Sequence, residues 1–240
     1  MTQELGILLI TAVSIGFFHT LFGPDHYVPF IVMAKARQWS AFKTTWITIV
    51  CGIGHVGSSI ILGFVGIAFG IAVAHLEPIE SMRGNIAGWS LIAFGLIYSI
   101  WGFRRAYRNR PHTHRHLHSD GKIHDHTHVH SEEHTHVHEK TGRPGMTPWI
   151  LFTIFVFGPC EPLIPVLMYP AAQGHIFNVV IVSFVFSIVT IGTMLTVVLG
   201  SIAGLRLLPT SQFERYTHAL AGVSILFCGI AVQFLGLIFF

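Results

Sequence analysis

The stretch FGPDHYVPFIVM, residues 22–33, returns in altered form in the second half of the chain as FGPCEPLIPVLM, residues 157–168. Both copies lie inside long apolar segments, and both begin with Phe-Gly-Pro. Proline lacks the backbone N–H of a regular helix and clashes with the preceding turn, so Gly-Pro within an apolar run predicts a broken helix. An acidic residue follows each Gly-Pro closely, which makes the two breaks candidate functional sites.

Two further matches support an internal repeat. AGWSLIAFG, residues 87–95, resembles AGVSILFCG, residues 221–229, and the two stretches are separated by almost the same interval as the Phe-Gly-Pro copies. Gly63 matches Gly200 at a similar offset. Glycine, alanine and isoleucine are common, so a single match carries little weight. Three matches in the same order at nearly one offset predict two copies of one unit.

The composition is that of an integral membrane protein. Of the 240 residues, 52% are hydrophobic and 10% are charged, against roughly 25% charged residues in a soluble domain. The mean hydropathy is +0.63. These values exclude a disordered chain and argue against a cytosolic domain. A helix that crosses a membrane needs about 20 apolar residues. Six segments qualify: about 5–33, 44–74, 85–103, 147–170, 177–204 and 216–239.

Six spans in two halves give three spans to each half. Because three is odd, the second half enters the membrane from the opposite side, as in the inverted repeats of many secondary transporters. The predicted fold class is therefore all-α: a polytopic membrane protein with six transmembrane helices in a 3+3 inverted repeat with broken first helices. The halves are residues 1–104 and 147–240, and residues 105–146 form the loop between them.

The orientation in the membrane follows from lysine and arginine. Thirteen of the fourteen fall in alternate loops, and the positive-inside rule places those loops, including residues 105–146, in the cytoplasm. Arg83 is the exception and lies beside Glu77 and Glu80. We therefore expect a multi-pass protein of the cell membrane with both termini outside.

The acidic residues within the predicted spans are Asp25 and Glu161, and both follow a repeated Phe-Gly-Pro. A charged group inside a bilayer is expensive and by default marks a site or a pathway. Histidine and cysteine lie close to the two breaks in the sequence, and carboxylate, imidazole and thiolate are ligands of divalent transition metals. The predicted metal site comprises His19, Asp25, His26, His55, Cys160 and Glu161.

Simpler interpretations of some of these residues stay open. Asp25 follows a proline that begins a helix, where a carboxylate stabilises the positive helix end, so it is also a candidate cap. His19 and His55 are equally candidates for hydrogen bonds to neighbouring helices. Two acids that each follow a repeated Phe-Gly-Pro, each beside a further ligand type, favour a metal site over caps alone.

The stretch HTLFGPDH, residues 19–26, resembles the signature of the nickel/cobalt transporter families, a histidine followed by a short spacer and Asp-His in an early span. Those families carry further histidines in span 2, which His55 resembles, and their efflux branch often has a histidine-rich cytoplasmic loop. One departure is the spacer, which has five residues between His19 and Asp25 where the permease pattern has four. The resemblance implies nickel or cobalt as the transported ion.

The second half resembles other members of the wider superfamily. FGPCEPLIP, residues 157–165, is similar to the transmembrane electron carriers of cytochrome c biogenesis and thiol-disulfide exchange. Those carriers need one cysteine in each repeat, whereas here Cys160 is matched by Asp25, so dithiol chemistry is disfavoured. Exporters of sulfite and organosulfonates are a third relative by architecture. Helix N-termini attract anions, but Asp25 and Glu161 oppose an anion unless both are protonated.

The loop between the halves is rich in histidine. Eleven of the 17 histidines lie between His112 and His138, interleaved with aspartate and glutamate. The segment has too few apolar residues to fold, and its composition is typical of metal binding. A solvated linker or a purification tag is the alternative. We interpret the segment as a cytoplasmic metal buffer whose removal leaves transport intact.

The sequence as a whole predicts transport of a divalent transition-metal ion by alternating access at a midplane site. Nickel or cobalt is the first choice of ion and zinc or copper the second; the cytoplasmic histidine store favours export. Nothing resembles a Walker motif, so we expect no ATP hydrolysis, no enzymatic activity and no cofactor besides the metal. The expected partners are the lipid bilayer and the metal ion but no nucleic acid, and a homo-oligomer stays open. The alternatives are a thiol-disulfide electron carrier and a sulfite or organosulfonate exporter.

Overall fold

The computed structural model describes residues 3–71, 73–108, 112–117, 123–128, 146–158, 160–206 and 211–235. Its α-helices are α1 (Gln3–Phe22), α2 (Val28–Ala36), α3 (Ala41–Ala68), α4 (Val73–Arg108), α5 (Met146–Phe157), α6 (Leu163–Ala172), α7 (Ile176–Arg206) and α8 (Thr217–Leu235). Short 3₁₀ helices, η1 (Pro24–His26) and η2 (Ser211–Tyr216), precede α2 and α8. Two strands, β1 (His112–Leu117) and β2 (Ile123–His128), lie between the halves.

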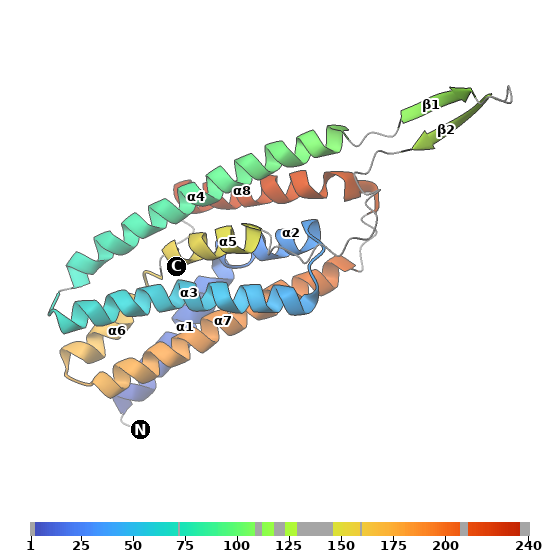
Figure 1. Ribbon diagram of the computed structural model, residues 1–240. Helices are drawn as coiled ribbons and strands as arrows, with labels where there is room; N and C mark the ends of the chain where they lie inside the picture. The colour runs from blue at the N-terminus through green and yellow to red at the C-terminus, as the bar shows by residue number, and fades with distance from the viewer. Residues whose placement is uncertain are drawn as a thin grey trace.

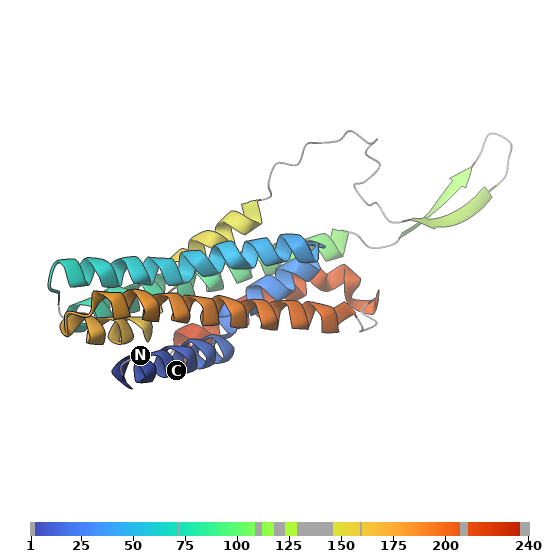
Figure 2. The same cartoon turned by 90° about the horizontal axis from the view of Figure 1, so that it is seen from below.

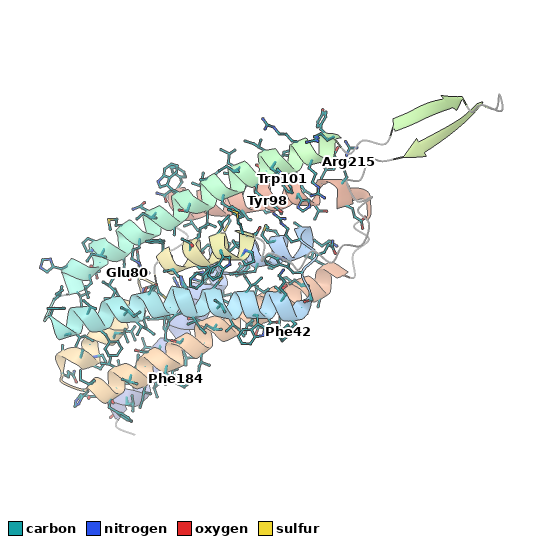
Figure 3. The ribbon with its side chains drawn as sticks, in the orientation of Figure 1. Phe42, Glu80, Tyr98, Trp101, Phe184 and Arg215 are labelled. Atoms are coloured by element: carbon teal, nitrogen blue, oxygen red, sulfur yellow. The ribbon has the colours of Figure 1, made fainter. Side chains whose placement is uncertain are left out.

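The helices have the length and the surface of membrane spans. Among the described residues, five helices are long and apolar enough to cross a bilayer: α1, α3, α4, α7 and α8. The outer surface carries large apolar side chains such as Phe42 on α3 and Phe184 on α7 (Figure 3), which are 73% and 65% exposed. Such a surface fits a lipid environment, and the predicted all-α polytopic membrane fold is confirmed.

Both predicted helix breaks are present. The first span consists of α1 and α2, which are separated by the 3₁₀ turn at Pro24–His26. The fourth span consists of α5 and α6, which are shorter apolar helices on either side of the second Phe-Gly-Pro. Pro159 itself lies outside the described residues. Each half thus begins with an interrupted helix, as the Gly-Pro pairs predict.

The two halves run in opposite directions. In Figure 1, α3 runs from the end of the bundle near the β-strands to the far end, and α7 runs the other way. The same reversal relates α4 to α8, which lie side by side in antiparallel orientation. Helix α1 starts toward the end of the bundle opposite the strands, and α8 runs toward that end but stops short of it (Figures 1 and 2). Which end faces the cytoplasm stays a prediction.

The contact between α4 and α8 reproduces the sequence repeat. A Cβ atom at Gly95 would lie 2.7 Å from Cα of Leu226, and one at Gly229 would lie 2.8 Å from the backbone nitrogen of Ile92. Leu226 is the repeat counterpart of Ile92, as Gly229 is of Gly95, so each contact is the repeat image of the other. A second pair of contacts, Gly88 with Gln233 and Gly222 with Ser99, has the same relationship.

The broken helices pack across the boundary between the halves. Helix α1 packs against α7 and, in the repeat-related contact, α5 packs against α3. Helix α2 likewise contacts α7 and α8, while α6 contacts α3 and α4. Each break is therefore held between helices of the opposite half, which brings both breaks into the interior of the bundle.

The third span begins earlier than predicted. The hydropathy pattern gives a span at about residues 85–103, but α4 begins at Val73 and continues through Pro78. Glu77, Glu80 and Arg83 therefore lie inside the helix, and Glu80 is 1% exposed. The expectation that Asp25 and Glu161 are the acids within the spans is corrected by this buried glutamate. Charged residues lower the hydropathy of this part of the helix, which is why the sequence alone begins the span too late.

The histidine-rich segment contains a hairpin. The segment is predicted to lack structure, but β1 and β2 pair in antiparallel register, with His114 opposite His126 and His116 opposite His124. The hairpin extends from the end of α4, away from the helices (Figure 1). The rest of the segment, including His130, His134, His136 and His138, lies outside the described residues.

Candidate functional site

The first break places two histidines against each other. The backbone N–H of Gly23 donates to the carbonyl of His19 at 3.0 Å and completes the last turn of α1. Pro24 then begins the 3₁₀ turn, in which the N–H of His26 donates to the carbonyl of Gly23 at 3.0 Å. This reversal brings the His26 ring to 4.8 Å from the His19 ring, measured between centroids. Each histidine is 2% exposed.

A third histidine comes from α3. His55 is also 2% exposed, and its Nε2 atom lies 3.2 Å from Nε2 of His26. One ring nitrogen from each of His19, His26 and His55 can be chosen so that all three lie within 4.8 Å of one another. Three imidazoles at this spacing are a ligand set that suits zinc, copper, iron or nickel. The cluster is built from α1, η1 and α3, all in the first half of the chain.

The hydrogen bonds of the rings decide which nitrogens are open. Nδ1 of His26 donates to the carbonyl of Gly23 at 3.1 Å and lies 3.3 Å from Oδ1 of Asp25. Nδ1 of His55 faces the end of α5, beside Gly158. In a neutral imidazole one nitrogen donates and the other accepts. When His26 is neutral its Nε2 is therefore the acceptor, and His55 donates the hydrogen bond between the two Nε2 atoms. Metal-binding histidines in proteins are held in this way, by a carbonyl or carboxylate on the other ring nitrogen.

Asp25 lies next to the His26 ring, on the side opposite His55. The carboxylate is partly buried, and its Oδ1 atom faces Nδ1 of His26, the nitrogen that does not face His55. A carboxylate in this position orients the imidazole and increases its basicity toward a metal. The structure thus places Asp25 beside the histidine cluster, with His26 between them. Its predicted role as a direct ligand stays a prediction.

The comparison with known families is consistent with this architecture. Residues 28–231 match the family of the cytochrome c biogenesis protein transmembrane region. The chain belongs to this family. The match supports the wider superfamily predicted from the second break, and it does not confirm the nickel/cobalt transporter families. No curated protein and no solved structure matches the chain.

The cysteines of this member of the cytochrome c biogenesis transmembrane family are not paired. Cys51, Cys160 and Cys228 are the three cysteines of the chain, all are buried, and none forms a disulfide. Cys51 belongs to the core cluster around Phe30, and Cys160 belongs to the separate cluster around Phe186. The repeat partner of Cys160 is Asp25, so the two breaks do not carry a pair of thiols.

Cys160 and Glu161 lie at the second break, outside the group of three histidines. Cys160 is fully buried, and its backbone N–H donates to Oε2 of Glu80 at 3.2 Å. Glu161 is partly exposed and its carbonyl accepts from Ile164 at 3.3 Å. The predicted ligand roles of Cys160 and Glu161 therefore have no support from proximity to the histidines, and they stay predictions.

The second break does reach the site through the residues just before Cys160. A Cβ atom at Gly158 would lie 2.8 Å from Nδ1 of His55 and 3.1 Å from the carbonyl oxygen of Phe155. The end of α5 is thus packed directly on the His55 ring. The two breaks meet at α3: the first supplies His19 and His26, and the second packs against His55.

The sequence did not identify Glu80 and Arg83 as parts of a site. The Arg83 guanidinium pairs with Oε1 of Glu80 and donates to the hydroxyl of Ser58. It also donates to the carbonyls of Val156, at 2.8 Å, and Gly158, at 3.4 Å. One sequence signal was available, because Arg83 is the lysine or arginine that departs from the alternate-loop pattern.

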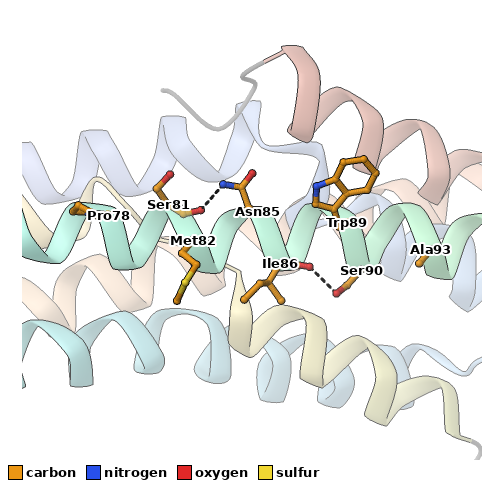
Figure 4. A pocket seen from close by; sticks show the side chains of 8 residues that line it. All are labelled: Pro78, Ser81, Met82, Asn85, Ile86, Trp89, Ser90 and Ala93. Carbon is orange, nitrogen blue, oxygen red and sulfur yellow. Dashed lines mark hydrogen bonds between the residues drawn. The ribbon is translucent and has the colours of Figure 1, made fainter.

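A groove on the outer side of α4 is a different kind of feature. It is lined by eight residues of that helix between Pro78 and Ala93 (Figure 4). Asn85 donates to the carbonyl of Ser81 at 3.1 Å and accepts from Gln233 of α8 at 2.7 Å, and Ser90 donates to the carbonyl of Ile86 at 2.6 Å. These groups are already satisfied, so the groove has the character of lipid-facing surface.

Proposed function

We propose that this protein carries a divalent transition-metal ion across the membrane, nickel or cobalt first, and that His19, His26 and His55 bind the ion. The observation that carries the proposal is the pair of Nε2 atoms of His26 and His55, which face each other at 3.2 Å. The two nitrogens share one proton in a hydrogen bond. A divalent cation that replaces this proton would be held by both imidazoles, with His19 as a further ligand.

The architecture supports alternating access as the mechanism. The site lies in the interior, at a helix break, between two halves of opposite orientation, which is the usual location of a substrate site in secondary transporters. The Gly-Pro breaks are also the points where the backbone departs from a regular helix. Movement of one half against the other opens the site to each face of the membrane in turn.

The histidine-rich segment would serve as a metal store at one end of the pathway. The paired strands bring histidines of β1 opposite histidines of β2, and imidazole is a ligand for nickel, copper and zinc. The positive-inside rule assigns this end to the cytoplasm. A store on that side favours export over uptake, because it raises the metal concentration at the cytoplasmic entrance.

A second candidate function is favoured by the family match. Membership of the cytochrome c biogenesis transmembrane family supports a thiol-disulfide electron carrier more directly than it supports metal transport. Cys160, at the second break, is the thiol that such a carrier would use. Electron transfer by dithiol exchange needs a second cysteine, and the other two, Cys51 and Cys228, are buried on α3 and α8.

The two functions are separated by comparing two variants in proteoliposomes. Metal flux is measured with a metal-sensitive dye inside the vesicles, for His55→Ala, Cys160→Ser and the wild-type protein. For metal transport we expect His55→Ala to abolish flux of nickel and cobalt, while Cys160→Ser retains most of it. Absence of metal flux in the wild type, together with thiol-disulfide exchange that Cys160→Ser abolishes, would establish the electron carrier instead.

A further inference from the structure

The second break is closed by an ion pair that comes from a different helix. Glu80 and Arg83 stand three residues apart on α4, and their side chains are 1% and 13% exposed. Glu80 faces α3 (Figure 3), where its Oε2 atom accepts a hydrogen bond from the hydroxyl of Ser59 at 3.2 Å. A buried pair of opposite charges in a membrane helix marks a functional element by default.

The pair satisfies backbone groups on both sides of the break. The last carbonyls of a helix have no partner within the helix, and Arg83 donates to those of Val156 and Gly158 at the end of α5. The backbone N–H of Cys160, beyond the break, donates to Glu80. The first break is closed locally instead, by the contact of His26 with the carbonyl of Gly23. The ion pair therefore holds the end of α5 and Cys160 against α3 and α4.

The position of the ion pair along the bundle shows which end of the bundle it lies toward. Ser58 and Ser59 follow His55 by about one helical turn on α3, toward the connection between α3 and α4. That connection lies at the end of the bundle opposite the hairpin (Figure 1). The ion pair thus forms the layer between the histidine cluster and the end remote from the hairpin. Cys160, which is 0% exposed, lies at the same level, because its backbone N–H is bonded to both Glu80 and Ser59.

We propose that Glu80 and Arg83 form the gate between the buried histidine cluster and the membrane face remote from the histidine-rich segment. Separation of α4 from the second break would leave both charges, the carbonyls of α5 and the N–H of Cys160 without partners. These groups are then satisfied by water, so an opened gate becomes a hydrated path to the cluster. In the closed gate, Glu80 and Arg83 form hydrogen bonds with Ser59 and with each other, so their polar groups have partners within the protein.

The test uses Cys160, whose backbone is bonded to Glu80, as a reporter of water access at the gate. A Cys51→Ala, Cys228→Ala background leaves Cys160 as the single thiol. A membrane-impermeant maleimide is added to sealed right-side-out and inside-out vesicles, and the alkylation rate of Cys160 is measured. Removing one charge alone leaves the other buried and unpaired, so the main variant is the double substitution Glu80→Gln, Arg83→Gln. The matched control is Glu77→Gln, an exposed acid on the same helix.

We expect the double variant to raise the alkylation rate of Cys160 at least about tenfold, only from the face remote from the histidine-rich segment, and Glu77→Gln to leave it unchanged. A second background, with Cys51 as the single thiol, detects general loosening, because the buried Cys51 lies one turn before His55 on α3, on the side away from Ser58 and Ser59. Continued protection of Cys160 in a variant that reaches the membrane overturns the proposal. So does equal labelling from both faces, or an equal rise at Cys51.

The proposed gate does not depend on which substrate the central site binds. The labelling experiment measures the accessibility of Cys160 and needs no transported metal. Loss of nickel and cobalt flux therefore tests the proposed function, and accessibility of Cys160 tests the gate. The two proposals fail separately.

Discussion

Nε2 of His26 lies 3.2 Å from Nε2 of His55, on a different helix. The two rings are nearly perpendicular, at 88°, with centroids 4.8 Å apart. The carbonyl of Gly23 holds the His26 ring on its other side, and the end of α5 packs on the His55 ring at Gly158. The hydrogen bond to Gly23 and the packing of Gly158 on His55 restrict the two rings, which is the preorganisation that the proposed cation site requires.

Removal of one imidazole should abolish tight metal binding. Loss of a residue that hydrogen-bonds to a metal ligand typically lowers metal affinity by roughly 10–100-fold. We expect His55→Ala to lower the affinity for nickel or cobalt by more than this, because the variant loses a ligand itself. Binding is measured by isothermal titration in a variant whose eleven histidines between His112 and His138 are replaced by asparagine. His175→Ala, at an exposed position, is the control. Unchanged affinity in His55→Ala would exclude the histidine cluster as the metal site.

Loss of the carboxylate behind His26 should have a smaller effect. We expect Asp25→Asn to weaken metal binding by roughly 10–100-fold, because the amide no longer supports the basicity of the imidazole. Glu161→Gln should have less effect, since Glu161 stands at the other break. The same titration measures both variants. A larger loss in Glu161→Gln than in Asp25→Asn would restore Glu161 as a ligand and contradict the supporting role of Asp25.

A methyl group at Gly158 should disturb the site without changing any ligand. The added Cβ would lie 2.8 Å from Nδ1 of His55, so the ring or the end of α5 must shift. We expect Gly158→Ala to weaken metal binding about tenfold or more, in the range that outer-shell changes reach. Gly57→Ala is the matched control on α3, where a Cβ meets nothing within 4 Å. Equal affinities in the two variants would show that α5 does not hold His55.

The contact between α4 and α8 should be intolerant of larger residues. A Cβ at Gly222 would lie 2.6 Å from Cα of Ser99, a backbone atom that cannot move aside by rotation. We expect Gly222→Ala to destabilise the protein by about 1–3 kcal/mol, the usual cost of overpacking. Gly200→Ala, on α7 with open space around it, should be neutral or stabilising. Thermal unfolding in detergent measures both, and equal stabilities would mean that the two helices are not in close contact.

The charges of the ion pair should be interdependent. Arg83→Gln leaves Glu80 buried without its partner, which typically costs about 3–5 kcal/mol. The double variant Glu80→Gln, Arg83→Gln removes both charges and should be more stable than Arg83→Gln alone. Thermal stability of the two single variants and the double variant gives a complete double-mutant cycle. Additive effects would show that the two side chains do not interact.

The described helices agree with the sequence where the pattern rests on continuous hydrophobicity and on proline. The broken first helices and the two oppositely oriented halves follow from patterns that any helix obeys. The beginning of α4 could not be predicted in this way, because Glu77, Glu80 and Arg83 reduce the local hydropathy. Glu80 and Arg83 are tolerated inside the bundle because they form an ion pair.

The candidate site divides in the same way. His19 and His26 were identifiable because the Gly-Pro break fixes their separation along the chain, and His55 because a family signature resembles this region. Their grouping, and the position of Cys160 and Glu161 apart from them, depends on which way each side chain points after a break. Repeat symmetry places Asp25 and Cys160 at equivalent positions, but the symmetry does not extend to the side chains that surround them.

Local chemistry alone thus determined three features of this chain. The length of the hydrophobic segments fixes where the chain crosses the membrane, and the missing N–H group of proline fixes where the helices break. The odd number of spans in each half makes the two halves inverted. Only the tertiary structure decided that three imidazoles meet while the thiol lies with a glutamate and an arginine. That outcome depends on how α3 and α4 pack against both breaks, and distances of a few ångströms between helices are set by the packing of the whole bundle.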